Sequence, residues 1–66
     1  MDVNKLREKM DAAGMNVETL ASEIGINRAS MYRKLARFER ITIGEALRIK
    51  DALDLSDEDA SHIFLT

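Results

Sequence analysis

The sequence predicts a compact all-α domain built from five helices. Three observations support this fold class: the 66 residues include no proline and only three glycines, apolar residues recur at intervals of three and four, and capping residues precede the apolar stretches. The chain is long enough for one small core. With no repeat, linker or low-complexity tract, residues 1–66 are expected to form a single domain.

The first helix is predicted over residues 3–13. Leu6 and Met10 lie about one turn apart and face inward, with other apolar residues at the same spacing. Asp2 can accept a backbone N–H at the N-terminus, and Gly14 ends the helix.

The middle of the chain, residues 17–36, has the spacing of two short helices that cross at a steep angle. Ala21 is small enough to let the second of these helices approach closely, and Gly25 can adopt the positive φ of a sharp turn. Met31 and Leu35 follow one turn apart and face inward. This pattern is typical of a helix-turn-helix motif, and it indicates DNA binding.

Caps bound the two helices of this motif. Asn16 can accept a backbone N–H at the start of a helix over residues 17–24, and Asn27 can do the same for a helix over residues 28–37. A loop around residues 38–40 follows.

Two capping boxes predict the last two helices. Thr42 and Glu45 form the first box, and Ser56 and Asp59 form the second. Acidic side chains crowd the first turn of the last helix, where the helix dipole favours them. The fourth helix is expected to bury five apolar residues: Ile43, Ala46, Leu47, Ile49 and Leu53.

Charge is segregated along the chain, although the net charge is only −2. One segment, residues 51–59, contains acidic residues and no basic one. A basic stripe elsewhere attracts phosphate locally, because screening over about 8 Å hides a distant acidic side. The basic residues of the predicted third helix and the loop after it are Arg28, Arg33, Lys34, Arg37 and Arg40.

Few residues offer material for catalysis or metal binding. The chain has no cysteine, and its single histidine, His62, has no suitably spaced acid pair. No base is placed to activate a serine, and no glycine-rich phosphate loop is present. We therefore expect neither an enzyme nor a metal site. The apolar runs are too short for a membrane span or a signal core, which favours a soluble protein.

Three segments carry a resemblance to a known protein family. They are LASEIGINRASMYRKL in the middle of the chain, TIGEALRIKDALDLS after it, and HIFL near the C-terminus. The chain resembles the lambda-repressor-like family of phage and bacterial regulators, also called the Cro or XRE type, along essentially its whole length. It departs from many relatives after the third helix. Those relatives have a polar loop that contains glycine, whereas this chain has Ala36, Arg37, Phe38 and Glu39.

The resemblance implies a sequence-specific DNA-binding transcriptional regulator. Its third helix would lie in the major groove of a palindromic operator, and two copies would act as a homodimer in a Cro-like repressor of phage or prophage origin. Size also favours a dimer, because one module with about 600–1,000 Å² of contact rarely binds an operator tightly alone. The protein would then be cytoplasmic and associated with the bacterial nucleoid, with no membrane partner, cofactor or small-molecule ligand.

Candidate base-reading residues lie on the outward face of the third helix. With Met31 and Leu35 turned inward, the outward positions that match the family's readout positions are Asn27, Arg28, Ala29, Tyr32 and Arg33. An arginine can bond guanine O6 and N7 together, for about 1–3 kcal/mol of discrimination, and an alanine can touch a thymine methyl. Tyr32 could stack on sugar, contact a methyl or bond a phosphate.

Candidate phosphate contacts frame the same helix. Helix N-termini bind anions through free backbone N–H groups, so the caps Asn16 and Thr42 mark two such positions. Basic residues supply the other flank: Lys34, Arg37 and Arg40.

The apolar end of the chain is a candidate dimer surface. Ile63, Phe64 and Leu65 place more apolar area there than a solvent-facing terminus needs. In the alternative arrangement, the first two of these residues close the core over the first helix and leave only Leu65 exposed.

The basic cluster has an alternative explanation as a solvated face. Arg28 or Arg37 could form a surface ion pair worth about 0–1 kcal/mol. The candidate acidic partners are Glu23, Glu39 and the acidic residues of the predicted fifth helix. A second function class also remains, a protein-interaction module such as an antirepressor or antitoxin whose acidic face holds a basic partner.

Overall fold

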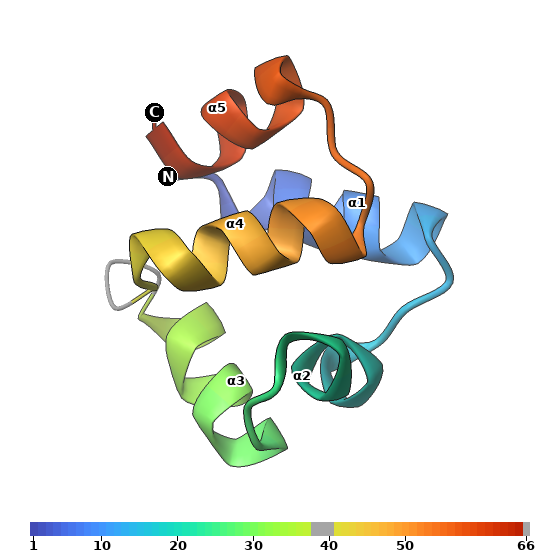
Figure 1. The fold of residues 1–66 in the computed structure, drawn as a ribbon, viewed down its shortest axis with the longest axis vertical. Helices are drawn as coiled ribbons and strands as arrows, with labels where there is room; N and C mark the ends of the chain where they lie inside the picture. The colour runs from blue at the N-terminus through green and yellow to red at the C-terminus, as the bar shows by residue number, and fades with distance from the viewer. Residues whose placement is uncertain (38–40, 66) are drawn as a thin grey trace.

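The computed structural model describes residues 1–37 and 41–65, and it confirms the all-α fold (Figure 1). The predicted loop around residues 38–40 lies outside the described residues. None of the described helices is both long and apolar enough to cross a membrane. In chain order the helices are α1 (Val3–Ala12), α2 (Val17–Ile24), α3 (Arg28–Ala36), α4 (Ile43–Ala52) and α5 (Asp57–Leu65).

The predicted caps at the first three helices are confirmed. The side chain of Asp2 accepts a hydrogen bond from the backbone N–H of Lys5 at 3.0 Å. Asn16 accepts from the backbone N–H of Thr19 at 2.8 Å, and the Thr19 hydroxyl accepts from the Asn16 N–H in return. Asn27 caps α3 by the same kind of bond, at 2.7 Å. Each cap satisfies an amide that the helix itself leaves without a partner.

The last two helices also begin where the sequence predicts. Thr42 and Glu45 form a complete capping box at α4, with bonds of 3.0 and 3.1 Å. At α5, the Ser56 hydroxyl accepts from the backbone N–H of Asp59 at 3.0 Å. These local bonds fix the starting points of the helices.

The turn between α2 and α3 depends on Gly25. This residue has φ of +80°, a conformation that side chains with a Cβ rarely adopt. The backbone N–H of Ile26 then donates to the carbonyl of Ala21 at 3.0 Å, which closes the end of α2. The chain is thereby redirected into α3 within three residues.

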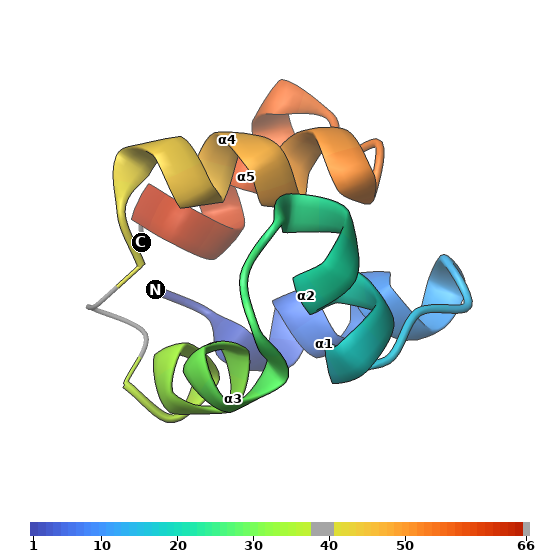
Figure 2. The ribbon, with the colours of Figure 1, turned by 60° about the horizontal axis from the view of Figure 1, so that its bottom comes forward.

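One core lies at the centre of the five helices. Among the described residues its buried members are Leu6, Met10, Leu20, Ala21, Ile24, Met31, Leu35, Ile49, Leu53, Leu55 and Ile63. In this arrangement α2 packs against both α3 and α4, while α5 packs against α1 (Figure 2). Helix α3 is held at one end of the molecule, with α5 at the other (Figure 1).

The expected burial of Ile43 and Leu47 is wrong. Ile43 is 82% exposed and Leu47 is 57% exposed, whereas Ile49 on the same helix is fully buried. At about 100° per residue, Leu47 lies roughly 160° around the helix from Ile49. Because α4 packs on α2 through the Ile49 face, the opposite apolar face is left uncovered.

Candidate nucleic-acid interface

The outward face of α3 is fixed by the two core residues on its other side. Met31 and Leu35 are buried, and they turn the rest of the helix toward solvent. Tyr32 is 54% exposed, and Ala29 and Arg33 are exposed beside it. The structure therefore brings the predicted base-reading residues together on one accessible face.

Asn27 has a structural role at the start of this face. Its side-chain oxygen accepts the 2.7 Å bond from Ser30, which defines the N-terminus of α3. Arg33 also contacts Ser30, donating to its hydroxyl at 3.3 Å. Ser30 thus links the cap to one of the two candidate reading arginines.

Arg28 is held by a carboxylate on the neighbouring helix. Its Nη1 lies 2.8 Å from Oε1 of Glu18, in the first turn of α2, and both side chains are largely exposed. The alternative of a surface ion pair is therefore confirmed for Arg28, but the partner is Glu18 and not the predicted Glu23, while Glu39 lies outside the described residues. An exposed pair of this kind contributes about 0–1 kcal/mol, and it engages only Nη1, so the guanidinium of Arg28 stays accessible.

Lys34 ties α3 to α4. Its Nζ lies 3.0 Å from Oε1 of Glu45, and the two side chains are only 22% and 14% exposed. The backbone N–H of Thr42 donates to the same carboxylate and, together with Lys34, lowers the pKa of Glu45 despite partial desolvation. This contact fixes the C-terminal half of α3 relative to the start of α4.

The remaining phosphate candidates lie at helix ends around the motif. Asn16 and Thr42 are exposed caps of α2 and α4, and Arg37 is the exposed residue that ends α3. Arg40 lies outside the described residues. The phosphate roles of all five candidates stay predictions.

The comparisons identify the motif. A family model for the Cro/C1-type HTH DNA-binding domain matches residues 5–60, most of the chain. The chain belongs to this family. Neither the curated proteins nor the solved structures that were searched gave a match. The protein is therefore a DNA-binding regulator of the Cro/C1 type, and α2 and α3 are its helix-turn-helix.

Charge in this Cro/C1-type domain is segregated in space as well as in sequence. The exposed arginines of α3 lie at one end of the molecule, and the acidic first turn of α5 lies toward the other (Figure 1). Asp59 on α5 pairs with Lys9 at 3.0 Å and with Lys5 at 3.7 Å. Part of the acidic charge thus joins α5 to α1, away from the motif.

The predicted dimer residues have different surroundings. Ile63 is fully buried because α5 packs on α1 through it, which removes this residue from any surface. Phe64 is half-buried against the core, and Leu65 is 80% exposed. The alternative arrangement, in which the end of α5 closes the core, is therefore the one that the fold adopts.

Within residues 1–37 and 41–65, no group of three or more metal-binding side chains comes together. DNA-binding domains of the HTH kind are typically not enzymes. The absence of enzymatic activity stays a prediction for this protein.

Proposed function

We propose that the protein is a sequence-specific transcriptional repressor, of the Cro-like kind found in phages and prophages, that binds a palindromic operator as a homodimer. The observation that carries this proposal is the outward face of α3, where exposed arginines surround Tyr32 and the buried Met31 and Leu35 hold the helix in place. Bound to its operator, the protein would occupy a site that RNA polymerase needs.

Arg33 and Arg28 are the residues that we expect to read bases. Each guanidinium can donate two parallel bonds to guanine O6 and N7 in the major groove. Arg28 would keep its exposed contact with Glu18 through Nη1, which orients the guanidinium, and donate its other N–H groups to the base. The helix caps and the basic residues after α3 would hold the phosphates and set the register without reading sequence.

Selection from a random duplex library, at about 0.15 M salt, tests this function. We expect enrichment of a palindrome whose half-sites lie about 10 base pairs apart. Arg33→Ala should relax the preference at one position of each half-site, while Arg7→Ala, an exposed arginine on α1, should leave the selected sequence unchanged. Uniformly weak, salt-sensitive binding to every duplex would contradict operator recognition.

A second candidate is a protein-interaction module, such as an antirepressor or antitoxin. The observation in its favour is the exposed acidic surface of α5, where Asp57 and Glu58 face solvent. Such a module would lose its partner on Glu58→Gln and tolerate Arg33→Ala. An operator binder would show the reverse pattern in the same two variants.

A further inference from the structure

The basic side chains of α3 are not equally available to DNA. Arg28, Arg33 and Arg37 are exposed, whereas Lys34 is half-buried. The Lys34 side chain is 22% exposed and that of Arg28 is 68% exposed, although each of them pairs with a glutamate. A cation that contacts a phosphate has to reach the surface, so Lys34 is the least accessible of these four side chains.

The position of Lys34 around α3 explains its burial. At about 100° per residue, Lys34 lies roughly 60° from the buried Met31 and about 100° from the exposed Arg33. Its side chain therefore leaves the helix beside the core, and its Nζ lies 3.0 Å from Oε1 of Glu45 on α4. Lys34 is thus directed toward the neighbouring helix, while Arg33, the next residue, faces outward.

Glu45 is a fixed partner for Lys34. The same Oε1 accepts a 3.0 Å hydrogen bond from the backbone N–H of Thr42, and only 14% of the Glu45 side chain is exposed. The bond from Thr42 and the contact with Lys34 keep the pKa of Glu45 below its usual range against partial desolvation, so the carboxylate is charged at neutral pH. The pair therefore joins α3 to a defined point in the first turn of α4.

Helix packing constrains the C-terminal half of α3 less than its buried face suggests. Within the described residues, α2 packs extensively against both α3 and α4, whereas the contact between α3 and α4 is slight. The pair of Lys34 with Glu45 connects these two helices directly. Because Arg33 is adjacent to Lys34 in the chain, a change in this pair is expected to move Arg33 relative to the bases.

A contact between Lys34 and a phosphate would require the pair to break. Glu45 would then remain half-buried and negatively charged close to the DNA backbone. Removing the partner of a desolvated charge costs far more than breaking an exposed pair. Arg28 differs, because its exposed contact with Glu18 engages only Nη1. The two ion pairs of α3 therefore have different consequences for DNA binding.

We propose that Lys34 and Glu45 form a brace that positions Arg33 for base reading, and that Lys34 does not contact a phosphate. This inference rests on the proposed function, in which Arg33 reads a base. It changes Lys34 from a phosphate candidate into a positioning residue and gives Glu45 a role in sequence discrimination. The two charges of the brace neutralise each other, so the brace is expected to release few counterions from DNA.

Salt titrations of a double variant separate the brace from a phosphate contact. They use the duplex enriched by selection and an unrelated duplex. Lys34→Met/Glu45→Gln removes both charges and keeps a side-chain oxygen for the Thr42 N–H, so the slope of log affinity against log salt should stay unchanged. Loss of a phosphate contact would make it shallower by about 0.9. The ratio of operator to unrelated affinity should fall by about fivefold, the low end of what one bidentate base contact contributes.

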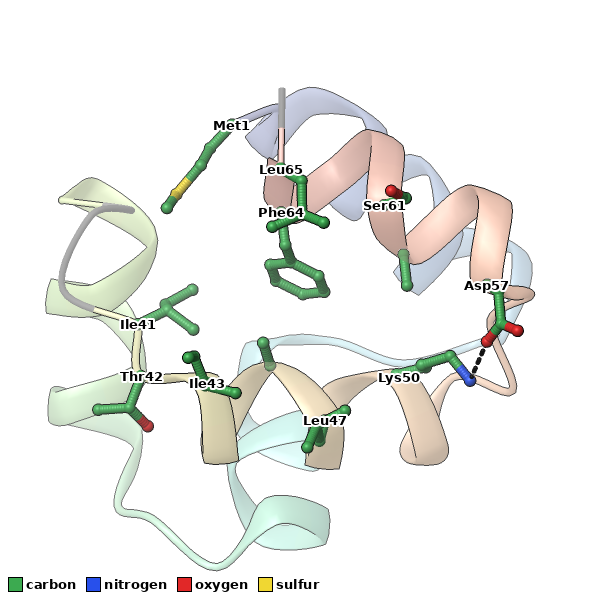
Figure 3. A pocket seen from close by; sticks show the side chains of 12 residues that line it. Met1, Ile41, Thr42, Ile43, Leu47, Lys50, Asp57, Ser61, Phe64 and Leu65 are labelled. Carbon is green, nitrogen blue, oxygen red and sulfur yellow. Dashed lines mark ion pairs between the residues drawn. The ribbon is translucent and has the colours of Figure 1, made fainter.

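A second ion pair provides the matched control. Lys50 pairs with Asp57 at 3.0 Å, and Figure 3 shows this pair at one edge of an apolar pocket between α4 and α5. The Lys50 side chain is 28% exposed, close to the value for Lys34. Lys50→Met/Asp57→Asn should leave both the slope and the affinity ratio unchanged. Lys34→Arg, which keeps a cation for Glu45, should retain the affinity ratio of the natural sequence.

Amide hydrogen exchange without DNA tests the brace independently of operator recognition. Lys34→Met/Glu45→Gln should speed exchange in residues 35–37, at the end of α3, more than in residues 6–10 of α1. Unchanged exchange, an unchanged affinity ratio or a slope shallower by about 0.9 would overturn the brace. Failure to enrich any duplex would instead overturn the proposed function, and the exchange result would still decide whether the pair holds α3.

Discussion

At the scale of single residues, the contact between Glu18 and Arg28 is expected to affect nonspecific and sequence-specific DNA binding in opposite ways. Glu18 places a negative charge in the first turn of α2, close to where a phosphate is expected, and it also orients Arg28 at 2.8 Å. The charge would oppose all DNA, whereas the orientation would favour the one base that Arg28 is proposed to read. One residue is thus expected to weaken general affinity and strengthen discrimination.

We therefore predict that Glu18→Gln strengthens binding to unrelated duplex by about two- to fivefold, the range of an exposed ion pair. The ratio of operator to unrelated affinity should fall, because Arg28 loses its orienting partner. Fluorescence anisotropy on both duplexes measures the two effects. Glu23→Gln serves as the control, since Glu23 is an exposed acid of the same helix. Equal changes for both variants would show that only net charge matters.

At the scale of elements, the junction of α1 and α5 depends on carboxylates. The Asp2 backbone N–H donates to the carbonyl of Ile63 at 2.8 Å, and its side chain caps α1 and contacts Nε2 of His62 at 3.1 Å. The backbone bond from Lys5 lowers the pKa of Asp2 most, against opposing desolvation. Asp59 joins the same two helices, and its bond with Lys9 lowers its pKa.

These lowered pKa values predict a loss of stability in acid. A carboxyl group whose pKa is lower in the folded state contributes stability above its unfolded pKa, about 4, and loses it as the pH falls through the folded value. Titration of these carboxyl groups should therefore leave the melting temperature constant from about pH 7 to 5 and lower it below about pH 4. Asp2→Asn, which keeps a capping oxygen, should make the acid slope shallower in circular dichroism melts. An unchanged slope would contradict a role for Asp2.

Elements also show what the sequence could predict. Caps and the Gly25 turn depend on residues within a few positions of each other, so the helix starts follow from local chemistry. The prediction fails for Ile43 and Leu47, because helical periodicity reveals apolar faces but not which neighbouring helix covers each face. The partner of Arg28 lies ten residues away, and finding it requires the crossing geometry of α2 and α3.

At the scale of the whole molecule, the separation of charge explains how a protein with a net charge of −2 can bind DNA. The arginines of α3 and the acids of α5 lie toward opposite ends of a domain measuring 27 × 24 × 19 Å. The screening length at physiological salt, about 8 Å, is much shorter than these dimensions. DNA at the α3 face is therefore expected to respond mainly to local positive charge.

The last prediction follows from this local charge. If each copy neutralises about four phosphates, log affinity for a half-site should fall against log salt with a slope near −3.6, and a dimer on the full operator should double it. Arg37→Ala should make the half-site slope shallower by about 0.9, because this exposed residue ends α3. Glu58→Gln, at the far end, should leave the slope unchanged although it alters the net charge by the same amount in the opposite direction. Anisotropy titrations across a salt series measure all three proteins, and shifts of equal size and opposite direction for the two variants would mean that net charge, and not the α3 face, controls binding.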